Sequence, residues 1–139
     1  MLSRACEYGI QATIYLAKKP EREYTLIREI SKGLSIPHHF LGKIMQTLVK
    51  KGILTSHKGP KGGLALSKKP EEITMMDVVT AIDGTDSITR CIMGSKKCDE
   101  NSTCPLHVAW CDNLEKIKLM FLHKSLSQLV HDLELSSPN

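Results

Sequence analysis

The feature that most constrains this chain is a pair of short helical repeats joined by a tight turn, within residues 25–52. The first repeat predicts a helix over residues 25–32, closed by Gly33, because glycine tolerates the left-handed backbone that ends many helices. Pro37 suits the first turn of the next helix, and Gly52 ends it. The apolar stripe of that second helix comprises Leu41, Ile44, Met45 and Leu48. Two short helices joined in this way are typical of a helix-turn-helix.

The opposite face of the second predicted helix is rich in hydrogen-bond donors and mostly basic. It carries His38, His39, Lys43, Gln46 and Lys50. The net charge of +4 is unevenly distributed, since residues 1–70 hold thirteen Lys/Arg and four Asp/Glu, whereas residues 71–139 hold six and eleven. Eight lysines and no acidic residue fall between residues 30 and 69. Such a stretch attracts a polyanion and neutralises phosphates, although a solvated lysine face would have the same composition.

A hairpin is predicted directly after these helices. Residues 53–57 and 64–67 are β-like, and the six residues between them include three glycines and a proline. Lys58 and Lys61 lie at the expected tip. A glycine- and proline-rich turn is usually only a turn, but a basic one that follows a basic helix is typical of a DNA-binding wing.

Further helices are predicted on both sides of this unit. Residues 3–19 form an N-terminal helix, and another begins at Ile73, with Thr74 and Asp77 as a capping box and Gly84 at its end. The apolar stripe of the N-terminal helix comprises Cys6, Ile10, Ile14 and Ala17. Because aromatic residues make up only 4% of the chain, the core is expected to be aliphatic.

The C-terminal part predicts a long helix over residues 105–123 and a short one that ends near Leu133, capped by Ser125 and Gln128. The long helix carries an apolar stripe of Trp110, Leu114, Ile117 and Phe121. Such a stripe is usually core, but residues 1–84 already make a compact unit, so we expect this helix to pack against a second copy. The predicted parts are a winged helix-turn-helix domain over residues 1–84, a cysteine-rich cluster-binding loop over 85–104, and dimerisation helices over 105–139.

The cellular compartment is inferred from what the sequence lacks. No apolar run approaches the roughly 20 residues that span a bilayer, and residues 1–7 carry charges where a signal peptide would be apolar. We therefore expect a cytoplasmic protein without a membrane partner. The chain has five cysteines, an odd number for a reducing compartment, which favours metal binding or redox chemistry over a disulfide framework.

Three of the cysteines fall in a loop-like segment. Cys91, Cys98 and Cys104 are separated by six and five residues, and His107 follows Cys104 by three. Three thiolates on a loop without apolar periodicity can converge on one soft metal centre, and His107 suits a fourth ligand. Zinc accepts the same ligands but prefers closer cysteine pairs. Free reactive thiols and a nucleophilic cysteine are the remaining readings. Cys6 is expected to be core, and Cys111 either core or a spare ligand.

Taken in order, these parts resemble the Rrf2 family of bacterial transcription regulators, which includes the iron–sulfur cluster biogenesis regulator and the nitric-oxide-sensing repressor. The motifs that carry the resemblance are E-Y-G-I-Q-A-T-I-Y-L-A over residues 7–17, the helix-turn-helix over 30–54, K-G-P-K-G-G-L-A-L over 58–66, I-T-M-M-D-V-V-T-A-I-D-G over 73–84, and the three cysteines with His107 and Trp110. The resemblance implies a mainly α-helical homodimer with a small β-hairpin, joined by its long C-terminal helices.

The resemblance also implies residue roles. Cys91, Cys98 and Cys104 match the three cluster ligands of the family, His107 matches the fourth ligand of the biogenesis regulator, and Glu7 stands where other members use an acidic ligand from the partner subunit. Tyr8, His39, Lys43, Ser56, Lys58 and Gly59 fall where family members touch DNA. Gly42 replaces a frequent glutamate and Lys58 a common arginine, so the operator cannot be copied from a relative. The full predicted DNA-binding set is Tyr8, Arg28, His38, His39, Lys43, Gln46, Lys50, Ser56, Lys58, Gly59 and Lys61.

We therefore predict a homodimeric transcription regulator, not an enzyme and without a small-molecule substrate, that binds a double-stranded DNA operator under the control of a labile iron–sulfur cluster. Gain or loss of the cluster is expected to order or release residues 91–104 and to shift the two recognition helices relative to each other. The alternatives are a metal-free regulator that senses oxidants through its thiols and, from another class, a thiol redox enzyme or iron–sulfur carrier. The sequence leaves open the cluster type, two-iron or four-iron, the signal, and activation versus repression.

Overall fold

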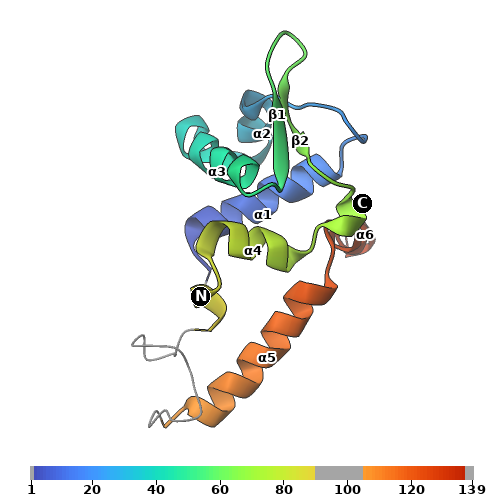
Figure 1. The fold of residues 1–139 in the computed structure, drawn as a ribbon. Coiled ribbons are helices and arrows are strands. Elements are labelled where there is room, and N and C mark those ends of the chain that lie inside the picture. The colour runs from blue at the N-terminus through green and yellow to red at the C-terminus, as the bar shows by residue number, and fades with distance from the viewer. Residues whose placement is uncertain (1, 90–104, 137–139) are drawn as a thin grey trace.

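The computed structural model describes residues 2–89 and 105–136 and is mainly α-helical with one two-stranded hairpin (Figure 1). The predicted fold class is thereby confirmed. The elements in chain order are α1 (Arg4–Ala17), α2 (Ile27–Leu34), α3 (His38–Lys50), β1 (Leu54–His57), β2 (Gly63–Leu66), the 3₁₀ turn η1 (Pro70–Glu72), α4 (Met75–Asp83), the 3₁₀ turn η2 (Asp86–Ile88), α5 (His107–His123) and α6 (Leu126–Ser136). No helix in the described ranges is long and apolar enough to cross a membrane.

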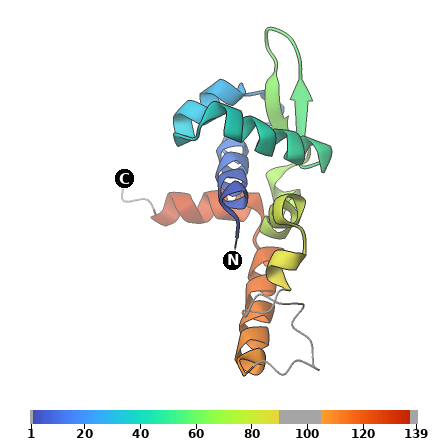
Figure 2. The ribbon, with the colours of Figure 1, turned by 90° about the vertical axis from the view of Figure 1, so that its left-hand side faces the viewer.

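Helix α1 lies at the centre of the fold and contacts α2, α3, α4 and α6 (Figure 2). Its fully buried residues are Cys6, Gly9, Ala12, Thr13 and Leu16. The predicted stripe was therefore only partly right, because Ile10, Ile14 and Ala17 are half-buried. A helix with neighbours on several sides buries more than one stripe, and small residues such as Gly9 and Ala12 allow those neighbours to approach.

Helix α2 differs from the prediction at both ends. It begins at Ile27, because Thr25 pairs with Leu64 of the hairpin instead of starting the helix. At the other end Gly33 stays inside the helix, and Ser35 takes the left-handed conformation with φ of 56°. Glycine at position 33 is explained by close packing and not by the end of the helix, since a Cβ there would lie 2.8 Å from the ring of Tyr15.

Helix α3 and the hairpin follow the prediction closely. Leu41, Ile44, Met45 and Leu48 are buried as expected. The hairpin strands pair antiparallel, with Leu54 opposite Leu66 and His57 opposite Gly63. Gly63 has φ of 140°, and a Cβ on it would come within 2.4 Å of the Thr25 carbonyl oxygen. Glycine is required there because the hairpin root approaches the backbone before α2.

The predicted capping box of α4 is present. The Asp77 N–H donates to the Thr74 hydroxyl over 3.2 Å, and the Thr74 N–H donates to the Asp77 carboxylate over 2.9 Å. Asp83, near the end of the same helix, accepts hydrogen bonds from both the backbone N–H and the hydroxyl of Ser3. These contacts fix the start of α1 against the end of α4.

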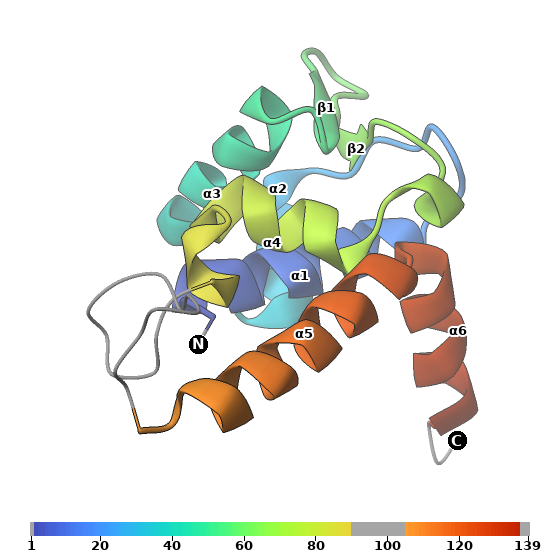
Figure 3. The ribbon, with the colours of Figure 1, turned by 60° about the horizontal axis from the view of Figure 1, so that its bottom comes forward.

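The two C-terminal helices leave the centre in different directions (Figure 3). Helix α5 packs on α4, where Phe121 and Val79 share a buried apolar cluster, whereas α6 turns back onto α1 and η1. Backbone hydrogen bonds tie the α5–α6 junction to α4, from Met75 to Lys124 and from Leu126 to Ile73, each over 2.8 Å. The division at residues 84 and 104 stays a prediction, but Leu126 of α6 lies in the same apolar cluster as α1 and α3.

We expect Leu126→Ala to lower the free energy of unfolding by about 2–4 kcal/mol, because it opens a cavity in the shared core. Leu126 is 1% exposed. Leu135→Ala, on the same helix at 73% exposed, is the matched control and should change stability by less than about 0.5 kcal/mol. Urea unfolding followed by circular dichroism measures both. Equal effects of the two replacements would mean that α6 does not belong to the core.

Candidate nucleic-acid interface and metal ligands

The predicted basic face of α3 is exposed in full. His38, His39, Lys43, Gln46 and Lys50 are all solvent-accessible, while the opposite side of the helix is buried. The helix and the hairpin lie at the end of the molecule away from the start of α5 (Figure 1). An exposed basic helix beside a projecting hairpin has the geometry of a recognition helix with its wing.

The hairpin tip presents the other predicted basic groups. Lys58, Gly59 and Lys61 are exposed at the tip, and Ser56 is exposed on β1. The turn is closed by a hydrogen bond from the Gly62 N–H to the Gly59 carbonyl over 2.9 Å. Gly59 has φ of 114° and no neighbour near its Cα hydrogens, so the backbone at the tip can approach another surface closely.

No carboxylate within the described residues neutralises this surface. The ion pairs found in the described residues join Lys19 to Glu29 at 3.7 Å, Lys118 to Glu115 at 3.3 Å and Lys124 to Asp132 at 2.9 Å. None of them involves a lysine of α3 or of the hairpin. The positive charge of α3 and the hairpin is thus available to an external polyanion.

Three predicted residues from different elements meet in one groove. Arg28 of α2, His38 of α3 and Ser56 of β1 line a groove of about 330 Å³. The groove is otherwise lined by Leu26, Ile27, Gly63 and Leu64. The groove lies between the start of α2 and the root of the hairpin. A DNA strand that passed from α3 to the hairpin would therefore cross the groove. Leu26 is 55% exposed there.

Tyr8 takes a supporting position beside α3. Its half-buried ring meets the Phe40 ring edge-on at 5.6 Å and fixes the start of α3 against α1. A hydrogen bond with Tyr8 raises the pKa of the Arg4 guanidinium at the start of α1. Arg4 is a cation beside Tyr8 that sequence reasoning missed, because a lone arginine in a first helical turn carries no pattern.

A second missed contact lies at the hairpin. The rings of Tyr24 and His57 are 5.2 Å apart, so the segment before α2 also braces β1. Together with the buried Thr25, these residues make the hairpin root part of the helix-turn-helix. The β-favouring pair Tyr24-Thr25, between Pro20 and α2, was the available signal.

Gly42 lies on the outer side of α3 and is half-buried. No atom lies within 4 Å of the position that a Cβ would occupy. The backbone here is open to a close-approaching partner, but glycine offers no side chain to a base edge. The predicted base contacts on this face are His38, His39 and Gln46.

The described residues contain only part of the predicted metal-ligand set. Cys91, Cys98 and Cys104 lie outside the described residues. His107 is the first residue of α5, which begins after residue 105 where the sequence predicted its start, and Glu7 is exposed in the first turn of α1. No group of three or more His, Cys, Asp or Glu side chains in residues 2–89 and 105–136 could hold a metal ion.

The other two cysteines differ from each other. Cys6 is fully buried, and burial together with the Asp83 carboxylate raises the pKa of its thiol to about 12. It is thus a protonated core residue at neutral pH, as predicted. Cys111 is half-buried, one turn after His107, with its Sγ 3.7 Å from Nδ1 and 3.9 Å from Nε2 of that ring. A thiol and an imidazole therefore stand together at the start of α5.

The sequence and the fold of this chain are similar to those of known transcription regulators. The chain is 30% identical over 132 residues to the HTH-type transcriptional regulator NsrR of Geobacillus kaustophilus, covering 94% of this chain and 90% of that protein. It is 29% identical over 128 residues to the regulator IscR of Serratia proteamaculans, covering 92% and 77%. Among solved structures, CymR, the global cysteine regulator of B. subtilis, has the same fold, with a TM-score of 0.81, 23% identity, and coverage of 94% and 96%.

The family comparison agrees with the resemblance that the motifs carry. Residues 2–132 match the Rrf2 family, which is described as iron-dependent transcriptional regulators. The match includes α1, the helix-turn-helix, the hairpin, α4 and α5. This chain belongs to the Rrf2 family of transcriptional regulators.

Proposed function

We propose that this Rrf2 regulator is a homodimer that binds operator DNA and is controlled by a labile iron–sulfur centre. The proposal that the protein binds DNA is supported by the exposed basic surface of α3 and the hairpin. The lysines of this surface have no carboxylate partner in the described residues. Lys43, Lys50, Lys58 and Lys61 supply phosphate contacts. His38, His39 and Gln46 supply candidate base contacts from the same helix.

The metal part rests on the chemistry of the donor set. Three thiolates and one imidazole are ligands that an iron–sulfur centre accepts. In this proposal Cys91, Cys98 and Cys104 hold the centre with His107, or with Glu7 as the alternative fourth ligand. The names of the IscR and NsrR relatives and the iron-dependent description of the family support this choice. When bound, such a centre supplies a charge and ligand set that respond to redox state, nitric oxide or iron–sulfur supply.

The fourth ligand determines how easily the centre is lost. An imidazole or carboxylate holds iron less firmly than a thiolate does, so either choice favours a labile centre. His107 is favoured because it stands three residues after Cys104 and is half-buried at the start of a helix. Cys111 is within 3.9 Å of that ring and can fix its orientation as an outer-sphere partner.

The dimer part rests on the side chains that α5 leaves exposed. Its inner face buries Leu114 and Phe121. Four other large apolar side chains of the helix are between 49% and 73% exposed, namely Val108, Leu119, Met120 and Leu122. Large apolar side chains gathered on one helix mark an interaction surface. A second copy of the chain is the occupant we propose, because operators read by helix-turn-helix dimers need two recognition helices about 34 Å apart.

The second candidate function is a metal-free regulator that senses oxidants through its thiols. Two observations favour it: the same fold occurs in a protein described as a global cysteine regulator, and Cys111 lies beside an imidazole that can assist thiolate formation. In that case peroxide should modify Cys91, Cys98, Cys104 or Cys111, and DNA binding should not require iron.

Replacing Lys43 or Lys58 by alanine should weaken DNA binding across sequences and reduce the slope of log K against log salt by up to about one unit each. Lys116→Ala is the matched control, because this lysine is exposed on α5, away from α3 and the hairpin. Fluorescence anisotropy with duplex oligonucleotides at several salt concentrations measures the slopes. If all three variants had the same slope as the parent, DNA would not bind at the basic surface.

After anaerobic purification, the parent chain should contain iron and acid-labile sulfide, and Cys91→Ala, Cys98→Ala and Cys104→Ala should each lose both. His107→Ala should shorten the lifetime of the centre in air about tenfold, if one weaker ligand bond is lost. His123→Ala, at the other end of α5, should leave the lifetime unchanged, and Glu7→Ala tests the alternative ligand. A colourless protein with stoichiometric zinc would contradict the iron–sulfur proposal.

Introducing charge on the exposed face of α5 should separate the subunits. We expect Leu119→Glu with Leu122→Glu to raise the dimer dissociation constant at least about a hundredfold, because two buried apolar contacts per subunit become charged. Leu26→Gln is the matched control, since this leucine is similarly exposed but lies on the DNA-facing groove. Analytical ultracentrifugation distinguishes the outcomes, and a double variant that remained dimeric would place the interface elsewhere.

A further inference from the structure

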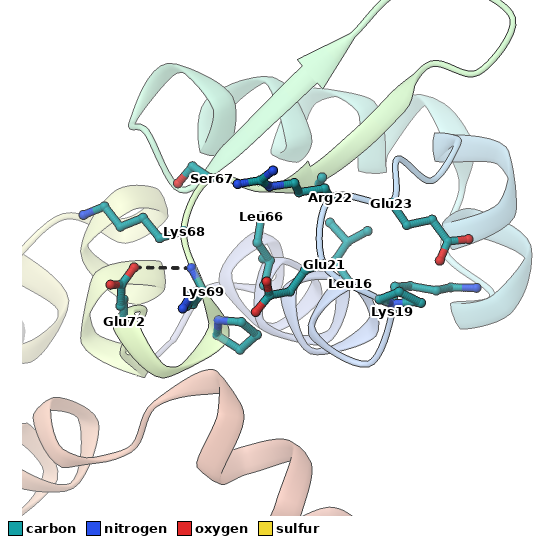
Figure 4. A pocket seen from close by; sticks show the side chains of 13 residues that line it. Leu16, Lys19, Glu21, Arg22, Glu23, Leu66, Ser67, Lys68, Lys69 and Glu72 are labelled. Atoms are coloured by element: carbon teal, nitrogen blue, oxygen red, sulfur yellow. Dashed lines mark hydrogen bonds between the residues drawn. The ribbon is translucent and has the colours of Figure 1, made fainter.

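A pocket outside the regulatory and DNA-facing parts remains without a role. It has a volume of about 270 Å³ and lies between the end of α1, the turn at residues 20–23, and the segment from β2 into η1 (Figure 4). Leu16 and Ala65 are buried and, with Leu66, make its apolar lining. The charged residues of the lining are Lys19, Glu21, Arg22, Glu23, Lys68, Lys69 and Glu72.

The pocket keeps groups of both charge signs available. Lys19 is engaged with Glu29 at 3.7 Å, and Glu72 accepts a hydrogen bond from the Lys69 N–H over 3.4 Å. Within the described residues Arg22 and Glu21 take part in no ion pair. Figure 4 shows the guanidinium of Arg22 on one side of Leu66 and the carboxylate of Glu21 on the other. A cation and an anion therefore flank an apolar surface.

The backbone at Arg22 gives an independent indication. The Glu23 N–H donates to the Pro20 carbonyl over 3.2 Å and closes a turn in which Arg22 has φ of 63°. Glycine or asparagine is favoured at a left-handed turn position, so arginine costs stability there. A side chain kept at a strained position is a reason to look for a function in that side chain.

We propose that this pocket binds a free α-amino acid in its zwitterionic form. Arg22 pairs with the ligand carboxylate, Glu21 pairs with the ligand ammonium, and the ligand side chain lies against Leu16, Ala65 and Leu66. A volume of about 270 Å³ is large enough to hold a ligand of the size of an amino acid. A zwitterion pairs with both Arg22 and Glu21, whereas a simple anion or cation pairs with only one of them. The proposal is independent of DNA binding and of the iron–sulfur centre.

Thermal unfolding of the full chain with each of the twenty common L-amino acids, at about 10 mM, tests the site. We expect a saturable rise in Tm for at least one of them and none for inorganic phosphate at the same ionic strength. Arg22→Asn should leave the Tm of the ligand-free protein equal or higher, because asparagine tolerates the left-handed turn, while its affinity for that amino acid falls about tenfold or more.

Glu21→Gln should weaken binding in the same way without touching the strained residue. Lys18→Gln and Glu71→Gln are the matched controls, because both are exposed and neither lines the pocket. If Arg22→Asn lowers the ligand-free Tm, the Glu21→Gln result decides. The proposal is overturned if no amino acid raises Tm, if phosphate raises it as much, or if both pocket variants keep the affinity of the parent.

Discussion

The DNA-facing surface depends on two hydrogen bonds that join Thr25 to Leu64. The Thr25 N–H donates to the Leu64 carbonyl over 2.9 Å, and the Leu64 N–H donates to the Thr25 carbonyl over 2.8 Å. Both residues are buried, so water cannot replace a lost partner, and each unsatisfied group would cost about 1–3 kcal/mol. A two-stranded hairpin is marginal by itself in water. These bonds make it a fixed part of the helix-turn-helix, with Gly63 as the residue that permits the approach.

The same short segment before α2 has two tasks. Residues 20–23 form one wall of the pocket, and Thr25 holds the hairpin root. Leu66 and Ser67, which leave the hairpin, form another wall. A ligand that bridges these walls would hold the hairpin root on both sides. If such a ligand strengthened DNA binding, thermodynamic linkage would require DNA to strengthen binding of the ligand by the same factor.

Local signals in the sequence predicted most of the fold. The stripe of α3, the capping box at Thr74 and the glycine-rich hairpin depend on residues close in the chain, and all three are present. The predictions were wrong where contacts with residues distant in the chain determine the local structure. Thr25 pairs with Leu64 instead of starting α2, and Gly33 makes room for the Tyr15 ring. Helix α1 buries Gly9 and Ala12 in addition to a single apolar stripe. For the DNA-facing site, the exposed basic set was readable from spacing, but the meeting of Arg28, His38 and Ser56 in one groove was not. The cysteine ligands stay predictions.

Attraction to DNA and choice of sequence are set by different parts of this molecule. In the proposed complex the lysines of α3 and the hairpin would contact phosphates of any sequence. Helix α3 offers His38, His39 and Gln46 as candidate base contacts, and no side chain at Gly42. With so few candidate base contacts in each subunit of the proposed dimer, discrimination between sequences would come largely from the spacing and orientation of the two copies. In a dimer joined through α5, that spacing is determined at the end of the molecule opposite the hairpin, where His107 and Cys111 stand. In that proposed dimer, a chemical change at the start of α5 would alter which DNA is bound without touching any residue proposed to contact it.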